Sequence, residues 1–188
     1  MIAFLDANIL YGPRLRGLLL RLAQGGLFRP RWSDAVQDEW TRSLAANTPG
    51  LGAEALAQLR QGLHQAMPDA RVAGYDALIP GLRLPDPGDR HVLAAAMACQ
   101  ACCIVTFNLR DFPAKVLAPF GLSALHPDRF LLQLDGRDPV GFAAALRRDM
   151  APDPSAAPDV AGYVTSLRRA HLPRTAAHVA ELAPILAR

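Results

Sequence analysis

The sequence predicts an α/β sandwich with a mainly parallel sheet, followed by an all-helical extension. Short apolar runs alternate with helical patterns over residues 1–134, as expected for strands that are joined by helices. The run Cys103–Thr106 is too apolar for a half-exposed strand, which indicates a central strand of a parallel sheet. Residues 135–188 show helical patterns without a convincing strand. We therefore predict two domains that meet near residue 134.

The first half of the chain predicts two strands, each followed by helix. Ile2–Leu5 is apolar and leads to Asp6, and a face of leucines with Gly25-Gly26 after it predicts the first helix and its end. Ser33 is a good N-cap for the helix that follows the second strand. The predicted elements are a strand over 2–6, a helix over 14–24, a strand over 28–32, and helices over 33–46 and 52–66.

The second half is ambiguous until residue 85, where 71–72 and 77–79 are read as either short strands or loops. From Pro87, which suits the first turn of a helix, the pattern becomes clear. The predicted elements are a helix from 87 to about 102, a strand over 103–106, a short helix after Pro113, an edge strand over 122–125, and helices near 138–150, 157–170 and 173–186, with a break at 151–155 between the first two of these three.

Composition limits the classes of function. The chain has 188 residues, of which 51% are hydrophobic, and no apolar run approaches the roughly 18 residues of a membrane span. The N-terminus starts with a strand pattern and lacks a basic segment, which disfavours a signal peptide. We therefore expect a cytoplasmic protein that does not bind membranes.

The net charge of +3 is compatible with a nucleic-acid partner. Lys115 is the only lysine, and arginine can bind a phosphate through two hydrogen bonds. Heavy arginine usage also follows from a GC-rich genome, so this signal is weak. The three cysteines at 99, 102 and 103 do not suit a disulfide framework and lack a second pair for zinc. They are predicted to be buried thiols.

Acidic residues occur where predicted strands meet helices. Asp6 ends the first strand, Asp86 and Asp89 open a helix, and Asp111 follows the Cys103 strand. Ligands bind at the carboxyl ends of parallel strands, so we expect these acids to converge. Glu39 borders the apolar face of its helix, where a carboxylate is costly without a partner. Oxygen-only ligands suit Mg²⁺ or Mn²⁺.

Each acid also has a simpler interpretation. Asp86 and Asp89 can cap a helix, Asp111 can pair with Arg110 or cap the next helix, and an acid after a strand often makes a turn. Asp38 is expected to be a solvated neighbour of Glu39.

Other polar residues near the acids have two interpretations each. His91 is either a ligand or RNA contact, or a histidine on the helix surface, and the second is favoured. Asn8 and Asn108 either orient carboxylates or a metal-bound water, or stabilise turns. Trp32 and Trp40 are expected in the core.

Four motifs in this order resemble PIN-domain ribonucleases, and more narrowly VapC-type toxins of bacterial toxin–antitoxin pairs. They are Leu5-Asp6-Ala7-Asn8-Ile9-Leu10, the helix of Glu39, the segment Asp86–Ala96 and the segment Ile104–Pro113. The resemblance covers about residues 1–130. It implies a three-layer α/β/α sandwich, an acidic pocket that binds Mg²⁺ or Mn²⁺, endonucleolytic cleavage of RNA, and inhibition by an antitoxin protein.

The resemblance assigns roles to individual residues. Asp6, Glu39 and Asp89 match the three core acids of the family. At the usual place of the fourth acid this chain has Asn108, with Asp111 the nearest acid and Asp86 another candidate. The metal ligands are thus expected among Asp6, Glu39, Asp86 and Asp89, and the catalytic residues are Asp6, Glu39, Asp89, Asn108 and Asp111. The tail resembles the helical C-terminal region of some longer PIN toxins.

The leading hypothesis is therefore a metal-dependent endoribonuclease, with Arg90 and Arg110 holding the RNA backbone. The replacement of an acid by Asn108 motivates an alternative, a non-catalytic binding module whose helical tail docks an antitoxin or a nucleic acid. A phosphohydrolase that uses Asp6 as a nucleophile is disfavoured, since Asn8 stands where a second aspartate is needed and Lys115 is badly placed. Dimerisation is common among the proteins that the chain resembles, so a homodimer is one alternative for its oligomeric state.

Overall fold

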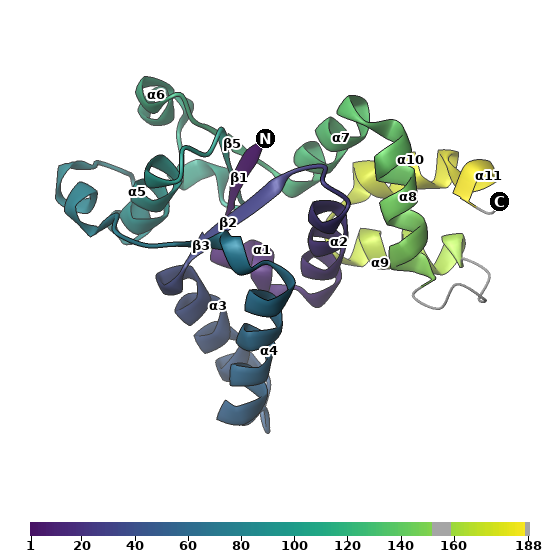
Figure 1. Cartoon of the computed structure of the whole chain (residues 1–188), viewed down its shortest axis with the longest axis horizontal. Coiled ribbons are helices and arrows are strands. Elements are labelled where there is room, and N and C mark those ends of the chain that lie inside the picture. The colour runs from purple at the N-terminus through teal and green to yellow at the C-terminus, as the bar shows by residue number, and fades with distance from the viewer. Residues whose placement is uncertain (152–158, 187–188) are drawn as a thin grey trace. The chain divides into compact units, whose positions relative to one another are not determined.

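The computed structural model describes residues 1–151 and 159–186, and these form two compact units (Figure 1). The sheet unit comprises residues 1–11 and 29–126, and the helical unit comprises residues 12–28 and the chain from 127 onward. Each unit is described by itself. The predicted domain boundary near residue 134 remains a prediction.

The sheet unit contains a five-stranded sheet in the order β3-β2-β1-β4-β5, in which every described pair of strands is parallel. This confirms the predicted α/β class with a parallel sheet and a helical C-terminal region. The strands are β1 (Ile2–Leu5), β2 (Arg29–Ser33), β3 (Arg71–Val72), β4 (Cys103–Val105) and β5 (Ser123–Leu125).

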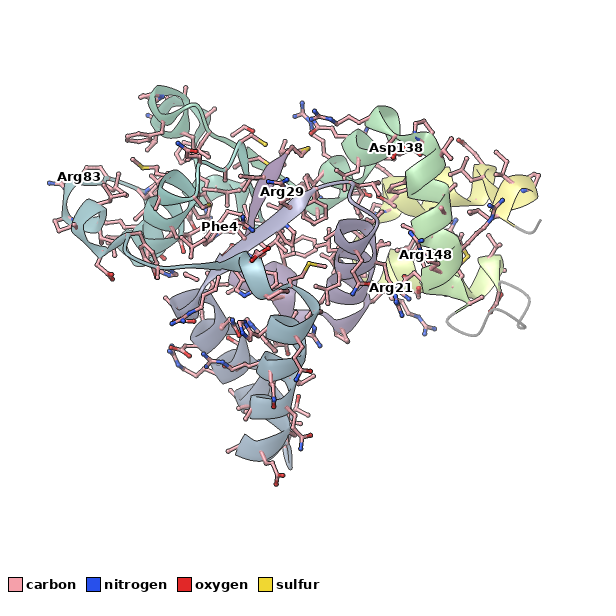
Figure 2. All side chains as sticks on the ribbon, viewed as in Figure 1. Phe4, Arg21, Arg29, Arg83, Asp138 and Arg148 are labelled. Carbon is pink, nitrogen blue, oxygen red and sulfur yellow. The ribbon has the colours of Figure 1, made fainter. Side chains whose placement is uncertain are left out.

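Strand β1 is central because its side chains are apolar on both faces. Phe4 is fully buried inside the sheet unit, whereas Arg83 projects from it (Figure 2). In the register of the sheet, Phe4 pairs with Arg31 on β2 and with Ile104 on β4. Strand β4 is buried throughout, as predicted from its composition.

A proline is tolerated within β2 because β3 is short. Pro30 pairs with Ala3 of β1, whereas β3 pairs only with Trp32 and Ser33 at the end of β2. Pro30 therefore lies where the strand has a partner on one side only, and a residue without an N–H group costs no ladder hydrogen bond there.

The helices of the sheet unit are α1 (Ala7–Tyr11), α3 (Asp34–Asn47), α4 (Ala53–Ala66), α5 (Arg90–Ala98) and α6 (Ala114–Leu117). Helix α3 begins at the predicted N-cap, since the Ser33 hydroxyl accepts a hydrogen bond from the Val36 N–H. Helix α3 packs on α1, β2 and α4, while α5 packs on β1, β2 and β4. Trp32 and Trp40 are each 1% exposed, which confirms their place in the core.

Helix α5 is shorter than the predicted helix over 87–102. It is preceded by a 3-10 turn at Pro87–Asp89 and ends at Ala98, with Cys99 as its C-cap. Gln100 has a left-handed backbone with φ of 53°, and the Ala101 N–H bonds the Ala96 carbonyl. This pair of features is the common reversal at a helix C-terminus, and it turns the chain into β4.

Two smaller sequence interpretations are settled by the structure. Arg71–Val72 forms a strand, whereas 77–79 lies in a 3-10 helix at Asp76–Gly81. Cys103 is buried and Cys99 is half-buried, but Cys102 precedes β4 and is exposed. The prediction of three buried thiols is therefore wrong for Cys102.

The helical unit consists of α2 (Pro13–Gln24), α7 (Pro127–Arg137), α8 (Pro139–Met150), α9 (Val160–Arg169), α10 (Pro173–Glu181) and α11 (Ala183–Leu186). The sequence analysis predicted no helix at α7, although Phe130, Leu131 and Leu134 share its buried face. The predicted helix over 173–186 is divided into α10 and α11. The predicted break at 151–155 falls, beyond Ala151, outside the described residues.

No helix in the described parts of the chain combines the length and the apolar character that a membrane crossing requires.

One buried carboxylate joins two helices of the helical unit. Asp128 on α7 is 4% exposed. Its oxygens accept hydrogen bonds from the N–H groups of Arg174 and Thr175 at 2.9 and 2.7 Å, and from the Thr175 hydroxyl at 2.6 Å. The carboxylate thus binds the first turn of α10, where free N–H groups and the helix dipole favour an anion.

Replacement of Asp128 by alanine is expected to lower the free energy of unfolding by about 3 kcal/mol, since it leaves buried donors unpaired. The matched control is Asp138→Ala, because Asp138 is an exposed N-cap that accepts one hydrogen bond from Gly141. Loss of an exposed cap costs about 1 kcal/mol. Urea unfolding measures both values, and equal losses would contradict a special role for Asp128.

Candidate functional site

Asp6 lies directly after β1 and is held by three hydrogen bonds. Its Oδ1 accepts from the Ala7 N–H at 2.7 Å, and its Oδ2 accepts from the Asn8 amide at 2.6 Å and the Thr106 hydroxyl at 2.7 Å. The side chain is 5% exposed. Burial raises the pKa of Asp6, and the hydrogen bonds from Thr106 and Ala7 oppose that shift.

Thr106 and Asn8 join the carboxyl ends of β1 and β4. The Asn8 amide also donates to the Thr106 hydroxyl at 3.0 Å, and its carbonyl oxygen accepts from the Phe107 N–H at 3.1 Å. The Thr106 hydroxyl further accepts from the Asn108 N–H at 2.9 Å. Asn8 therefore orients a carboxylate, which was one of its two predicted roles.

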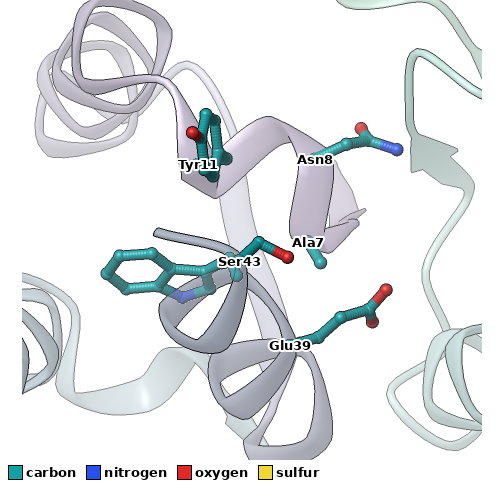
Figure 3. A pocket seen from close by; sticks show the side chains of 6 residues that line it. Ala7, Asn8, Tyr11, Glu39 and Ser43 are labelled. Carbon is teal, nitrogen blue, oxygen red and sulfur yellow. The ribbon is translucent and has the colours of Figure 1, made fainter. Parts of the chain in front are cut away.

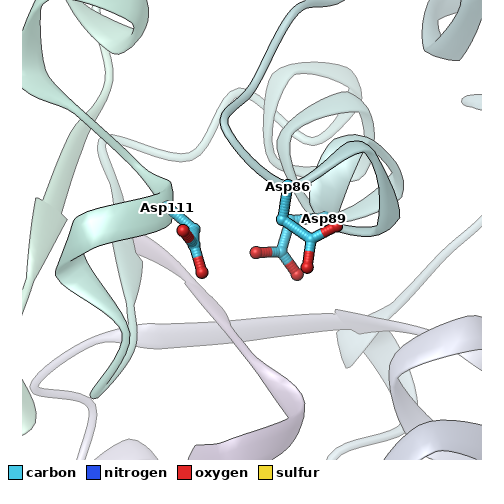
Figure 4. A group of neighbouring side chains, drawn as sticks. All are labelled: Asp86, Asp89 and Asp111. Carbon is cyan, nitrogen blue, oxygen red and sulfur yellow. The ribbon is translucent and has the colours of Figure 1, made fainter.

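Three further acids approach one another at the start of α5 and after β4 (Figure 4). Carboxylate oxygens of Asp86, Asp89 and Asp111 lie within 4.8 Å of one another. Asp86 also accepts a hydrogen bond from the Gly88 N–H at 2.7 Å, so it caps the 3-10 turn as predicted. Capping and participation in an acidic cluster are therefore compatible for this residue.

Asp111 is oriented by Asn108, whose amide donates a short hydrogen bond to Asp111 Oδ2. The Arg110 guanidinium lies 3.9 Å from Asp111 Oδ1, but its side chain is 91% exposed. Exposed ion pairs of this kind contribute little. The charge of Arg110 therefore does little to offset the negative charge of Asp111.

Asp89 is the most perturbed acid of the group. Its Oδ2 is buried and has no hydrogen-bond partner among the described residues. Burial, followed by repulsion from four carboxylates, raises the pKa of Asp89 to about 7. In decreasing order these carboxylates are Asp6, Asp86, Asp111 and Glu39.

Glu39 on α3 lies beside His91 on α5, with 3.7 Å between Glu39 Oε2 and His91 Nε2. Burial and the charge of Asp6 raise the pKa of Glu39. The His91 side chain is only 22% exposed, so the favoured placement on the helix surface is wrong. Burial lowers the pKa of His91, and the negative charge of Asp6 partly opposes that shift.

The structure thus gathers all the predicted site residues in the sheet unit. Asp86, Asp89 and Asp111 form the closest group, while Asp6 and Glu39 are coupled to Asp89 electrostatically. An all-oxygen donor set, a buried carboxylate oxygen without a partner and mutual repulsion are what a hard divalent cation would satisfy. The residues therefore fit Mg²⁺ or Mn²⁺.

A pocket of about 210 Å³ adjoins the acids between α1 and α3 (Figure 3). Its lining consists of Ala7, Asn8, Tyr11, Glu39, Trp40 and Ser43. The sequence analysis did not identify Tyr11 or Ser43 as site residues. Ser43 lies four residues after Glu39 on α3, and Tyr11 lies four residues after Ala7 on α1, so a search along the same helix faces could have found both.

The PIN domain family matches residues 3–110 of the chain. A curated protein of Mycobacterium tuberculosis, named "Putative ribonuclease VapC50", is 52% identical over 63 residues. That match covers 33% of this chain and 37% of the relative, so the chain spans little more than a third of the relative's length. No solved structure matches the chain.

The raised pKa of Asp89 predicts that the free energy of unfolding of the metal-free protein depends on pH. Because the folded state holds the proton more tightly than the unfolded state, stability is lost as pH rises from about 4 through about 7. Asp89→Asn removes this ionisation. In EDTA, its melting temperature is expected to exceed that of the unmodified protein at pH 8, with a difference that shrinks toward pH 5.

Asp38→Asn is the matched control for this measurement, because Asp38 is an exposed acid that pairs with Arg60. Addition of Mn²⁺ at pH 8 should raise the melting temperature of the unmodified protein and not that of Asp89→Asn. A difference between the two proteins that is constant with pH would contradict the assignment.

Proposed function

Because the chain belongs to the PIN domain family, we propose that it is a metal-dependent endoribonuclease and the toxin of a toxin–antitoxin pair. The observation that carries this proposal is the convergence of Asp89 with four other carboxylates at the carboxyl edge of the sheet. Such a concentration of negative charge repels RNA unless a cation is bound. The ribonuclease name of the mycobacterial relative supports the same activity.

Asp6, Glu39, Asp86 and Asp89 are the proposed metal ligands, and Asp111 lies close enough to Asp86 and Asp89 to join them. When bound, Mg²⁺ or Mn²⁺ supplies a Lewis acid that activates water and neutralises charge on a phosphodiester.

Polar side chains next to the acids orient the carboxylates for metal binding. Thr106 and Asn8 hold the Asp6 carboxylate in one orientation, and Asn108 does the same for Asp111. Asn108 thus stands at the usual position of the family's fourth acid but directs another acid toward the site. In this way Asn108 would act as a positioning residue, and Asp111 would supply the missing charge.

RNA would be held by arginines on the same side of the sheet unit. The exposed guanidinium of Arg110 follows β4, and Arg90 opens α5 directly after Asp89. Contacts to phosphate fix the position of a strand without reading its sequence. Burial lowers the pKa of His91, which disfavours its charged form beside Glu39.

The two alternative functions find less support. A non-catalytic module would not need five neighbouring carboxylates. Their burial and mutual repulsion destabilise the folded protein, and a scaffold gains no function in return. A covalent phosphohydrolase needs a second aspartate two residues after Asp6, whereas this chain has Asn8 there, and the Asn8 amide donates a hydrogen bond to Asp6. Both observations favour the nuclease.

Further properties are proposed on the same basis. They are an RNA substrate, a cognate antitoxin, a cytoplasmic location and a homodimer. A nuclease domain over residues 1–134 and a helical extension over residues 135–188 remain the proposed division. The helical unit is the proposed binding surface for the antitoxin or for a second copy.

Asp6→Asn is expected to lower RNA cleavage in Mn²⁺ by more than about a hundredfold, since loss of even an outer-shell partner of a metal costs about 10–100-fold. The amide keeps the size of the side chain, so the circular dichroism spectrum should not change. Cleavage is measured on a mixed RNA pool, with the exposed Asp38→Asn as control. Undiminished cleavage by Asp6→Asn would refute the proposed function.

Thr106→Val tests the orientation of Asp6 without removing a carboxylate. Thr106 is fully buried, and valine has the same shape but cannot donate the 2.7 Å hydrogen bond to Asp6. We expect the affinity for Mn²⁺ to fall by about 10–100-fold, measured by isothermal titration calorimetry. An unchanged affinity would show that the hydrogen bond does not position the ligand.

A further inference from the structure

The pocket between α1 and α3 is built from two helices that also carry site residues. Ala7 and Tyr11 line it from α1, and Ser43 lines it from α3 (Figure 3). Trp40 of α3 also belongs to the lining. Helices α1 and α3 pack directly on each other within the sheet unit. The pocket is therefore a feature of a packed helix pair, with a volume of about 210 Å³.

The pocket shares two residues with the acidic site. Glu39 and Asn8 line the pocket, and Glu39 is also electrostatically coupled to Asp6 and Asp89. Asn8 is fixed by its hydrogen bonds to Asp6 and Thr106, so this wall of the pocket is rigid. A strand whose phosphodiester lies at the acids would bring its adjacent nucleoside to the pocket.

The chemistry of the lining suits a nucleobase better than a second phosphate. Glu39 is the only charged residue of the lining, and its negative charge disfavours an anion. Tyr11 contributes an aromatic ring to the lining, and aromatic side chains are the usual platform for an unpaired base. Ser43 is exposed, and its hydroxyl can bind a base edge or a 2′-hydroxyl.

We propose that this pocket is the subsite for the nucleoside adjacent to the cleaved phosphodiester, and that Tyr11 and Ser43 determine which base is accepted there. The inference rests on the proposed nuclease function and deepens it. The pocket selects among sequences through stacking and hydrogen bonding, while the acids act on the phosphodiester itself.

The test compares four proteins on a random-sequence RNA pool in Mn²⁺: the unmodified protein, Tyr11→Ala, Ser43→Leu and Ala45→Leu. Ser43→Leu fills the pocket from an exposed position. Ala45→Leu adds the same side chain to an exposed position of α3 outside the pocket lining, so it is the matched control. Sequencing of the cleaved ends gives the base preference, and a short single-stranded RNA gives kcat and KM.

We expect a base preference beside the cleaved bond in the unmodified protein and in Ala45→Leu. Tyr11→Ala and Ser43→Leu should weaken or change that preference and lower kcat/KM about tenfold, mainly through KM, as loss of a stacking platform does. The same base preference and kcat/KM in all four proteins would overturn the inference.

Failure of the proposed function is distinguishable from failure of the subsite. If the unmodified protein cleaves no RNA, the nuclease proposal fails. Fluorescence anisotropy with a short single-stranded RNA then still tests whether the pocket binds RNA. Weaker binding by Tyr11→Ala and Ser43→Leu alone supports an RNA subsite, and equal binding by all four proteins excludes it.

Discussion

The hydrogen bond from the Thr106 hydroxyl to Asp6 is the interaction on which the site depends. It joins the carboxyl ends of β1 and β4, the two strands at the centre of the sheet. Asn8 and the backbone of Asn108 bind the same hydroxyl, so the loop after β4 is held next to the loop after β1. Because parallel pairing already aligns these strand ends, a few short polar side chains are sufficient to orient the acids of both loops.

The neighbouring carboxylates destabilise the folded protein, and packing elsewhere in the sheet unit must offset this. Asp89 has a buried oxygen without a partner among the described residues, and burial, followed by repulsion from the neighbouring carboxylates, raises its pKa. The five consecutive buried residues Val92–Ala96 of α5, packed on three strands, keep this helix start in place. Functional sites commonly hold groups whose charged forms are disfavoured. A bound divalent cation would attract each of these carboxylates and so offset their repulsion of one another.

The family match and the compact units divide the chain differently. The match ends at residue 110, yet it includes α2, which belongs to the helical unit. Helix α2 packs on α8, and Asp128 binds the start of α10. The helices beyond the family match therefore share a packed core with α2 and are joined by polar contacts between α7 and α10.

Local pattern alone determined much of this protein. Alternating apolar runs predicted the parallel sheet, and acids where predicted strands meet helices pointed to Asp6, Glu39, Asp86, Asp89 and Asp111, because element type and strand ends depend on neighbouring residues. Tertiary structure decided what depends on distances between elements. It placed Asp111 rather than Asp6 closest to Asp86 and Asp89, half-buried His91 beside Glu39, ended α5 at Ala98, and formed α7 and the Tyr11–Ser43 pocket. Packing sets these distances, and no spacing along the chain reports them.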